Sequence, residues 1–117
     1  MSSPITTHIL DTSVGRPAAG VVVTLERQVQ SGEARSWEAI GDGKTDDDGR
    51  VKDLLPPDTL IAGIYRIHFE IGAYFQALGR EAFYPEATIV FQVKNPEEHY
   101  HVPLLLNPYG FSTYRGS

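Results

Sequence analysis

Hydrophobic and polar residues alternate along much of this chain with a period of two, which is typical of β-strands that bury one face. The segments 21–26 (VVVTLE) and 65–71 (YRIHFEI) show this alternation most clearly. Less regular runs of the same kind predict further strands at 5–11, 36–41, 87–93, 99–106 and 111–116. The pattern therefore predicts at least seven short strands.

Turn-forming residues separate the predicted strands, so the connections should be short. Gly, Pro, Asn and Asp gather at 14–20 (VGRPAAG), 31–34 (SGEA), 42–50 (DGKTDDDGR), 54–58 (LLPPD) and 94–98 (KNPEE). One stretch, 72–83 (GAYFQALGREAF), breaks the alternation. It has apolar residues at Tyr74, Phe75 and Leu78, and Gly79 follows as a stop, so one short helix is predicted there.

The length of 117 residues is that of one ordinary domain, so residues 1–117 are expected to form a single domain. Seven or eight short strands and one helix predict an all-β fold, either a sandwich or a small barrel. Side chains fill the interior of such a fold and leave little room for a deep pocket. A functional site is therefore expected at the loops or between subunits.

Charge and cysteine content exclude several kinds of partner and site. A net charge of −5 and a pI near 5.2 argue against a surface for nucleic acid or anionic membrane, which needs clustered Lys and Arg. The absence of cysteine excludes disulfides, thiolate nucleophiles and Cys-based zinc sites. The start, MSSP, leaves no room for a signal peptide, and no apolar run approaches the roughly 20 residues of a membrane helix. We expect a soluble, cytoplasmic protein.

Histidines are the main candidates for chemistry, because imidazole exchanges protons near neutral pH. His68 lies between charged residues on the polar face of a predicted strand and is interpreted as a solvated surface residue. His99 and His101 are two apart in a strand, so their side chains point to one side, and with His8 they could hold a metal. The alternative left open is a binding module in which the histidines have no chemical role.

Other site motifs are missing from the sequence. The segment 44–49 (KTDDDG) lacks the acidic first ligand of a calcium loop, and Leu55 stands where its closing Glu should be. There is no G-x-S-x-G elbow for a serine nucleophile and no phosphate-binding glycine motif.

Two long motifs, HILDTSVGRPAAGV (8–21) and YHVPLLLNPYGFSTYRGS (100–117), resemble the signatures of the transthyretin superfamily. DDDGR (46–50) and FYPE (83–86) lie between them in the order and spacing of that superfamily, so the resemblance spans nearly the whole chain. One departure is Asn107, where the superfamily has serine or a similarly small residue; it should affect a turn and not the chemistry.

The superfamily contains carriers of thyroid hormone and hydrolases of 5-hydroxyisourate, the unstable product of urate oxidation, and this chain resembles the hydrolases. His8 stands where the carriers have lysine, Arg50 where they have glutamate, and His101 where they have threonine. The ending YRGS (114–117) is similar to the hydrolase terminus. The resemblance implies a cofactor-free enzyme of urate degradation that opens a six-membered ring by adding water at an amide bond.

The resemblance also implies an architecture and an assembly. Each chain would form a sandwich of two four-stranded sheets with one short helix, pair edge to edge into a dimer, and stack as a dimer of dimers into a homotetramer. His8, Arg50, His101 and the segment 114–117 would line the channel between the dimers, where each site draws residues from more than one subunit.

The implied reaction assigns a role to each residue of this site. His101 is the first candidate for the general base and His8 the second, while Arg50 suits the developing oxyanion and the substrate carbonyls. Positioning roles are expected of the remaining residues: Tyr114 through its ring and hydroxyl, Gly116 by letting the backbone approach closely, and Arg115 by ion pairing or substrate contact. The Ser117 carboxylate would orient a histidine or pair with Arg115. Two alternatives stay open: a carrier that binds in the same channel without catalysis, and a metal-dependent enzyme that uses His8, His99 and His101.

Overall fold

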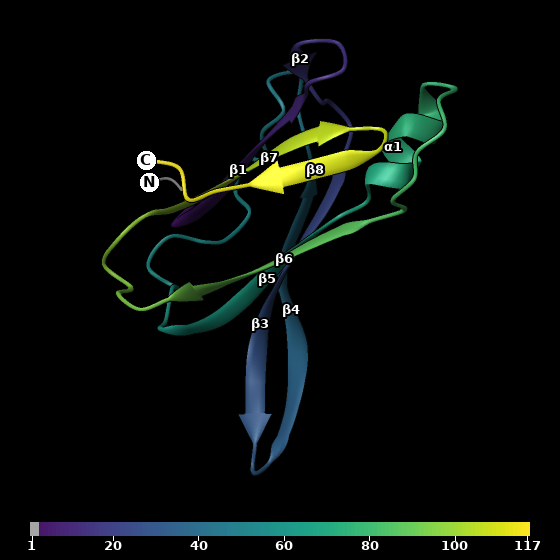
Figure 1. Ribbon diagram of the computed structural model, residues 1–117. Helices are drawn as coiled ribbons and strands as arrows, with labels where there is room; N and C mark the ends of the chain where they lie inside the picture. The colour runs from purple at the N-terminus through teal and green to yellow at the C-terminus, as the bar shows by residue number, and fades with distance from the viewer. Residues whose placement is uncertain (1–2) are drawn as a thin grey trace.

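Eight strands and one short helix form within residues 3–117, the part of the chain that the computed structural model describes (Figure 1). Within these residues no helix has the length and apolar character needed to cross a membrane. The elements are β1 (Ile5–Asp11), β2 (Arg16–Pro17), β3 (Val22–Ser31), β4 (Ala34–Lys44), β5 (Gly63–Phe69), α1 (Ile71–Ala77), β6 (Ala87–Val93), β7 (Tyr100–Asn107) and β8 (Gly110–Thr113).

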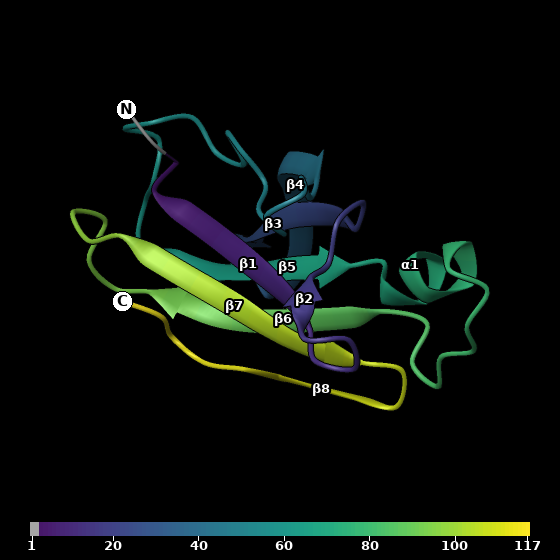
Figure 2. The same cartoon turned by 90° about the horizontal axis from the view of Figure 1, so that it is seen from above.

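The strands form two four-stranded sheets, with the orders β2-β1-β7-β8 and β4-β3-β5-β6. β1 and β7 run parallel, and the other neighbouring strands are antiparallel. Figure 2 shows the first sheet lying over the second, with α1 at one end of the molecule and the start of β1 and the end of the chain at the other. The expected sandwich of two four-stranded sheets with one short helix is confirmed.

The core lies between the two sheets because the alternating apolar residues of each strand point inward. On β5, Tyr65, Ile67 and Phe69 are fully buried, whereas Arg66 and His68 between them are partly exposed. β1 follows the same alternation, and so does β7 apart from the buried Pro103, so that the remaining side chains of both strands lie on the outer face of the first sheet. That outer face carries the candidate site.

The strand boundaries agree most closely with the predicted ranges where one face of the strand is buried, and they differ most where neither face is. β1 and β6 span the predicted ranges 5–11 and 87–93. β3 and β4 continue past the predicted ranges into a hairpin that projects from the sandwich (Figure 1), and residues 29–36 of this hairpin are exposed on both faces. Without a buried face there is no selection for alternating hydrophobic residues, so the pattern did not reveal this extension.

Three details of the predicted elements were wrong. Ile71 is the first residue of α1 and not the last of a strand, because its side chain is buried against the core from the helix. The final strand ends at Thr113, so 114 and 115 lie outside it. β2 was missed, since a strand of two residues is too short to show alternation.

Candidate active site

The outer face of the sheet β2-β1-β7-β8 brings together side chains from the two ends of the chain. The parallel register of β1 and β7 pairs Thr6 with His101 and His8 with Pro103. Since the neighbouring residues of β1 point into the core, Thr6, His8 and His101 share the outer face, where each is half-buried. The two histidines expected to act on the substrate therefore lie on adjacent strands.

A tight turn brings Arg50 beside His8. The Asp46 carboxylate accepts the backbone N–H of Arg50 at 3.1 Å, and the backbone N–H of Asp46 donates to the Arg50 carbonyl at 2.8 Å. The N–H of Arg50 is the main cause that lowers the pKa of Asp46. Gly49, at a positive φ of 77°, accepts the N–H of Ile9 at 2.8 Å, and a β-bridge joins Arg50 to His8. The backbone of Arg50 is thus anchored to β1, while its side chain is exposed.

Thr6 links the two histidines of the 99–101 segment. Its hydroxyl lies 2.8 Å from Nδ1 of His101 and 2.9 Å from Nε2 of His99. A hydroxyl has one proton to donate, so it donates to one ring and accepts from the other. When His101 carries its proton on Nδ1, Thr6 accepts that proton and donates to His99, and this leaves Nε2 of His101 as the basic nitrogen.

The surroundings of His101 favour the neutral imidazole. Burial is the main cause that lowers the pKa of His101 below its ordinary value of 6.5, and the charges of His8, His99 and Arg50 lower it further. A base must be unprotonated before it can accept a proton, so the lowered pKa keeps His101 competent at neutral pH.

The carboxyl-terminal residues close one side of the His101 ring. The N–H of Gly116 donates to the His101 carbonyl at 2.9 Å, and a Cβ at position 116 would overlap the imidazole. The backbone at Gly116 therefore packs directly against the His101 ring. A depression of about 560 Å³ opens beside this contact. Its lining includes Arg50, His99, His101 and Ser117.

Comparison with known proteins shows which family the chain belongs to. The profile described as the HIUase/Transthyretin family matches residues 5–116. The chain belongs to this family. It is 45% identical over 116 residues to the 5-hydroxyisourate hydrolase of Salmonella typhi, a match that covers 99% of this chain and 82% of the relative.

Two solved structures of the HIUase/Transthyretin family are also similar to this chain. The 5-hydroxyisourate hydrolase of Klebsiella pneumoniae has a TM-score of 0.80 and 40% identity, and the match covers 97% of this chain and 98% of that one. Sea bream transthyretin in complex with thyroxine has a TM-score of 0.89 and 32% identity, with 97% and 95% covered. The TM-score is higher for the transthyretin, whereas the sequence identity is higher for the hydrolase. The fold alone therefore does not distinguish an enzyme from a carrier. The side chains at the site carry that distinction.

Of the expected site residues, Arg50, His101 and Ser117 line the depression, whereas His8, Tyr114, Arg115 and Gly116 are not part of its lining. Tyr114 and Arg115 line a second hollow of about 270 Å³, which also includes residues 89–92 of β6 and shares His101 with the depression. Arg115 donates to Glu98 at 3.2 Å and to the His99 carbonyl at 3.3 Å, and its guanidinium lies 4.5 Å from the ring centre of Tyr100. These contacts fit the ion-pairing role considered for Arg115, although its partner is Glu98 and not the chain terminus.

The metal alternative does not agree with the geometry of the three histidines. Of the residues from 3 to 117, the only three metal-ligating side chains whose ligand atoms converge within 4.8 Å are His68, Glu70 and Glu86. His8, His99 and His101 do not form such a group, and Thr6 occupies the position between two of them.

Sequence reasoning missed Thr6, and this residue gives a first prediction. Thr6→Val keeps the shape of the side chain but removes the hydroxyl that orients His101, so we expect kcat to fall roughly 10- to 100-fold with little change in KM. Thr6→Ser, which restores the hydroxyl, should recover most of the rate. Steady-state kinetics of the wild type and the two variants tests this expectation. A Thr6→Val enzyme with the wild-type kcat would show that Thr6 does not assist catalysis.

Proposed function

We propose that the protein hydrolyses 5-hydroxyisourate by adding water at an amide bond, which opens the six-membered ring. The observation that carries this proposal is the meeting of His8, Arg50 and His101 at one outer surface of the sheet, although they come from three distant segments. The named relatives support the hydrolase over the carrier.

The neutral Nε2 of His101 takes a proton from water, and the resulting hydroxide adds to the amide carbonyl carbon of the ring. Thr6 stabilises the ring orientation of His101 during this transfer, since it accepts the proton of Nδ1. The imidazolium then returns its proton to the ring nitrogen as the carbon–nitrogen bond breaks. The product carries a new carboxyl group, and His101 is neutral again.

Arg50 stabilises the negative charge that forms on the carbonyl oxygen, because its guanidinium is permanently charged and presents a planar set of donors. His8, held beside Arg50 by the β-bridge, binds a second polar group of the substrate and is the alternative base. The Gly116 backbone keeps the His101 ring in place and Ser117 borders the substrate. No step in this scheme requires a cofactor.

The lowered pKa of His101 predicts the pH dependence of the reaction. Protonation of His101 removes the base, so kcat/KM should fall on the acid side with a midpoint below the ordinary histidine value of 6.5. Activity should consequently stay constant through neutral pH. A profile of kcat/KM against pH measures the midpoint, and a midpoint at or above 6.5 would contradict His101 as the group that titrates.

We further propose the homotetramer, a dimer of dimers with the sites at the dimer–dimer interface. A single chain leaves Arg50 and His99 exposed and the depression open to solvent, and a facing copy would enclose it. Tyr114 and Arg115, which line a different hollow in their own chain, then serve by contact across the interface. Native mass spectrometry tests this assembly: a tetramer is expected, and a monomer that keeps full activity would contradict it.

The direct test of function follows the decay of 5-hydroxyisourate generated in place from urate by urate oxidase. The protein should accelerate this decay, and an excess of chelator should leave the acceleration unchanged. Decay at the spontaneous rate would favour the carrier, which binding of thyroxine would then examine. Loss of the acceleration on adding the chelator would instead indicate a metal-dependent enzyme.

A further inference from the structure

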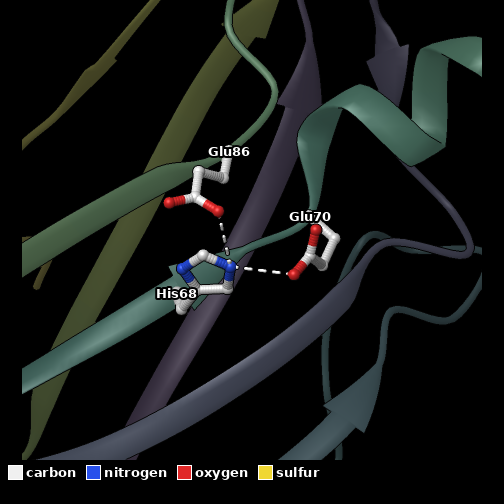
Figure 3. Close-up of side chains that lie close together, drawn as sticks. All are labelled: His68, Glu70 and Glu86. Carbon is white, nitrogen blue, oxygen red and sulfur yellow. Dashed lines mark hydrogen bonds and ion pairs between the residues drawn. The ribbon is translucent and has the colours of Figure 1, made fainter.

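A second group of ionisable side chains lies on the other sheet, at the junction of β5, α1 and β6 (Figure 3). Nε2 of His68 is 2.9 Å from a carboxylate oxygen of Glu70 and 3.5 Å from one of Glu86. Figure 3 shows both carboxylates directed at the same nitrogen of the ring. His68 is therefore not the solvated surface histidine that the sequence indicated: only 21% of its side chain is exposed.

The spacing of these atoms fits a tetrahedral metal ion. Ligands at Zn²⁺ bond lengths of about 2.0 to 2.2 Å stand roughly 3.3 to 3.6 Å apart along the edges of a tetrahedron. The two nitrogen–oxygen separations, 2.9 and 3.5 Å, lie near that range, and one ligand atom from each residue falls within 4.8 Å of the others. Small side-chain rotations are enough to place all three around one ion.

The other nitrogen of His68 is already held in the way that metal-binding histidines require. Nδ1 lies 3.0 Å from the hydroxyl of Thr88, its partner in the β5–β6 register. When Nδ1–H donates to this hydroxyl, the lone pair of Nε2 points toward the two carboxylates. A hydrogen bond of this kind fixes the tautomer and orientation of histidine ligands in metal sites.

The backbone that carries the three residues is also fixed. The N–H of Gly72 donates to the carbonyl of Pro85 at 2.9 Å, and a Cβ at position 72 would lie 2.8 Å from that oxygen. This close packing joins the start of α1 to the segment that precedes Glu86. The ligands therefore need no backbone movement to converge, which lowers the entropy cost of binding an ion.

The contacts of the Glu70 side chain are a separate indication of a cation site. Glu70 occupies the N-cap of α1, a position that favours Ser, Thr, Asp or Asn. Its side chain makes no capping hydrogen bond and instead lies 2.9 Å from Nε2 of His68. Among residues 3–117, no lysine or arginine forms an ion pair with Glu70 or Glu86. Two carboxylates thus share one imidazole, and a divalent cation would neutralise their combined charge.

We propose that His68, Glu70 and Glu86 bind a divalent transition-metal ion, with Zn²⁺ as the preferred ion and water as the fourth ligand. One imidazole with two carboxylates suits Zn²⁺, whereas Ca²⁺ and Mg²⁺ favour oxygen ligands alone. The site lies on the sheet opposite the candidate active site, so the bound ion would join β5, α1 and β6 and take no part in hydrolysis. This proposal is independent of the proposed function.

Isothermal titration of the chelator-stripped protein with ZnCl₂ tests the proposal. We expect the wild-type protein to bind one ion per chain at this site, and His68→Ala and Glu86→Gln each to weaken that binding at least about tenfold. The Glu86 side chain is 57% exposed, so Glu86→Gln should fold normally. Circular dichroism of each variant checks folding.

The matched control is His101→Asn, which alters the histidine group on the other sheet and should leave the binding unchanged. His68→Ala should also keep the hydrolase rate. Wild-type protein that binds no Zn²⁺ would overturn the proposal. So would binding that survives in both His68→Ala and Glu86→Gln but is lost in His101→Asn, since the ion would then sit at the candidate active site.

Discussion

His101→Asn should lower kcat for 5-hydroxyisourate by about 10² to 10⁴, the range that a general base contributes. Asparagine has no group that accepts a proton at neutral pH, but its amide is polar and smaller than the imidazole. The fold should survive, because His101 lies half-buried on the outer face of the sheet and not in the core. The rate of enzyme-dependent decay of the substrate measures this effect. Native mass spectrometry confirms that the assembly of the variant is that of the wild type.

Two comparisons make this result specific to His101. His68→Ala removes a histidine from the opposite sheet and should leave the rate nearly unchanged. The residual activity of His101→Asn should no longer fall at acid pH with the wild-type midpoint, because the titrating group is gone. If the activity of His101→Asn still fell at acid pH with the wild-type midpoint, His8 would be assigned as the general base in place of His101.

Arg50→Gln should lower kcat by about 10² to 10³, the usual cost of removing one donor to an oxyanion. Arg50→Lys should fall between this variant and the wild type, since lysine keeps the positive charge but loses the planar fork of donors. Because the charge of Arg50 also lowers the pKa of His101, Arg50→Gln should move the acid limb of the pH profile to higher pH. Kinetics of both variants across pH measures the two effects together.

Lys52 provides the control for Arg50, because it lines the same depression with the same charge. Lys52→Gln should change the rate little, since the β-bridge to His8 anchors Arg50 and not Lys52. Equal losses in Arg50→Gln and Lys52→Gln would show that the depression needs only positive potential, and the specific role of Arg50 would be lost.

Several properties of this protein were determined by the sequence itself. A period of two in the apolar residues assigns each of them to a buried or an exposed face, so β1 and β6 could be bounded to the residue. Family motifs mark His8, Arg50 and His101 as candidate site residues, and the composition of 46–50 predicts a turn between strands. These features are local or rest on long motifs, so they need no knowledge of the partner strands.

Only the tertiary structure decided which of these residues meet. Alternation assigns a face but neither the neighbouring strand nor the register, since both depend on pairing between distant segments. The parallel pairing of β1 with β7 places Thr6 against His101, and the β5–β6 register with the close packing of Gly72 brings Glu86 to His68. No motif marks Thr6, and the motif FYPE (83–86) contains Glu86 without showing which side chain it meets. The proposed roles of both residues follow from the side chains that the fold places beside them.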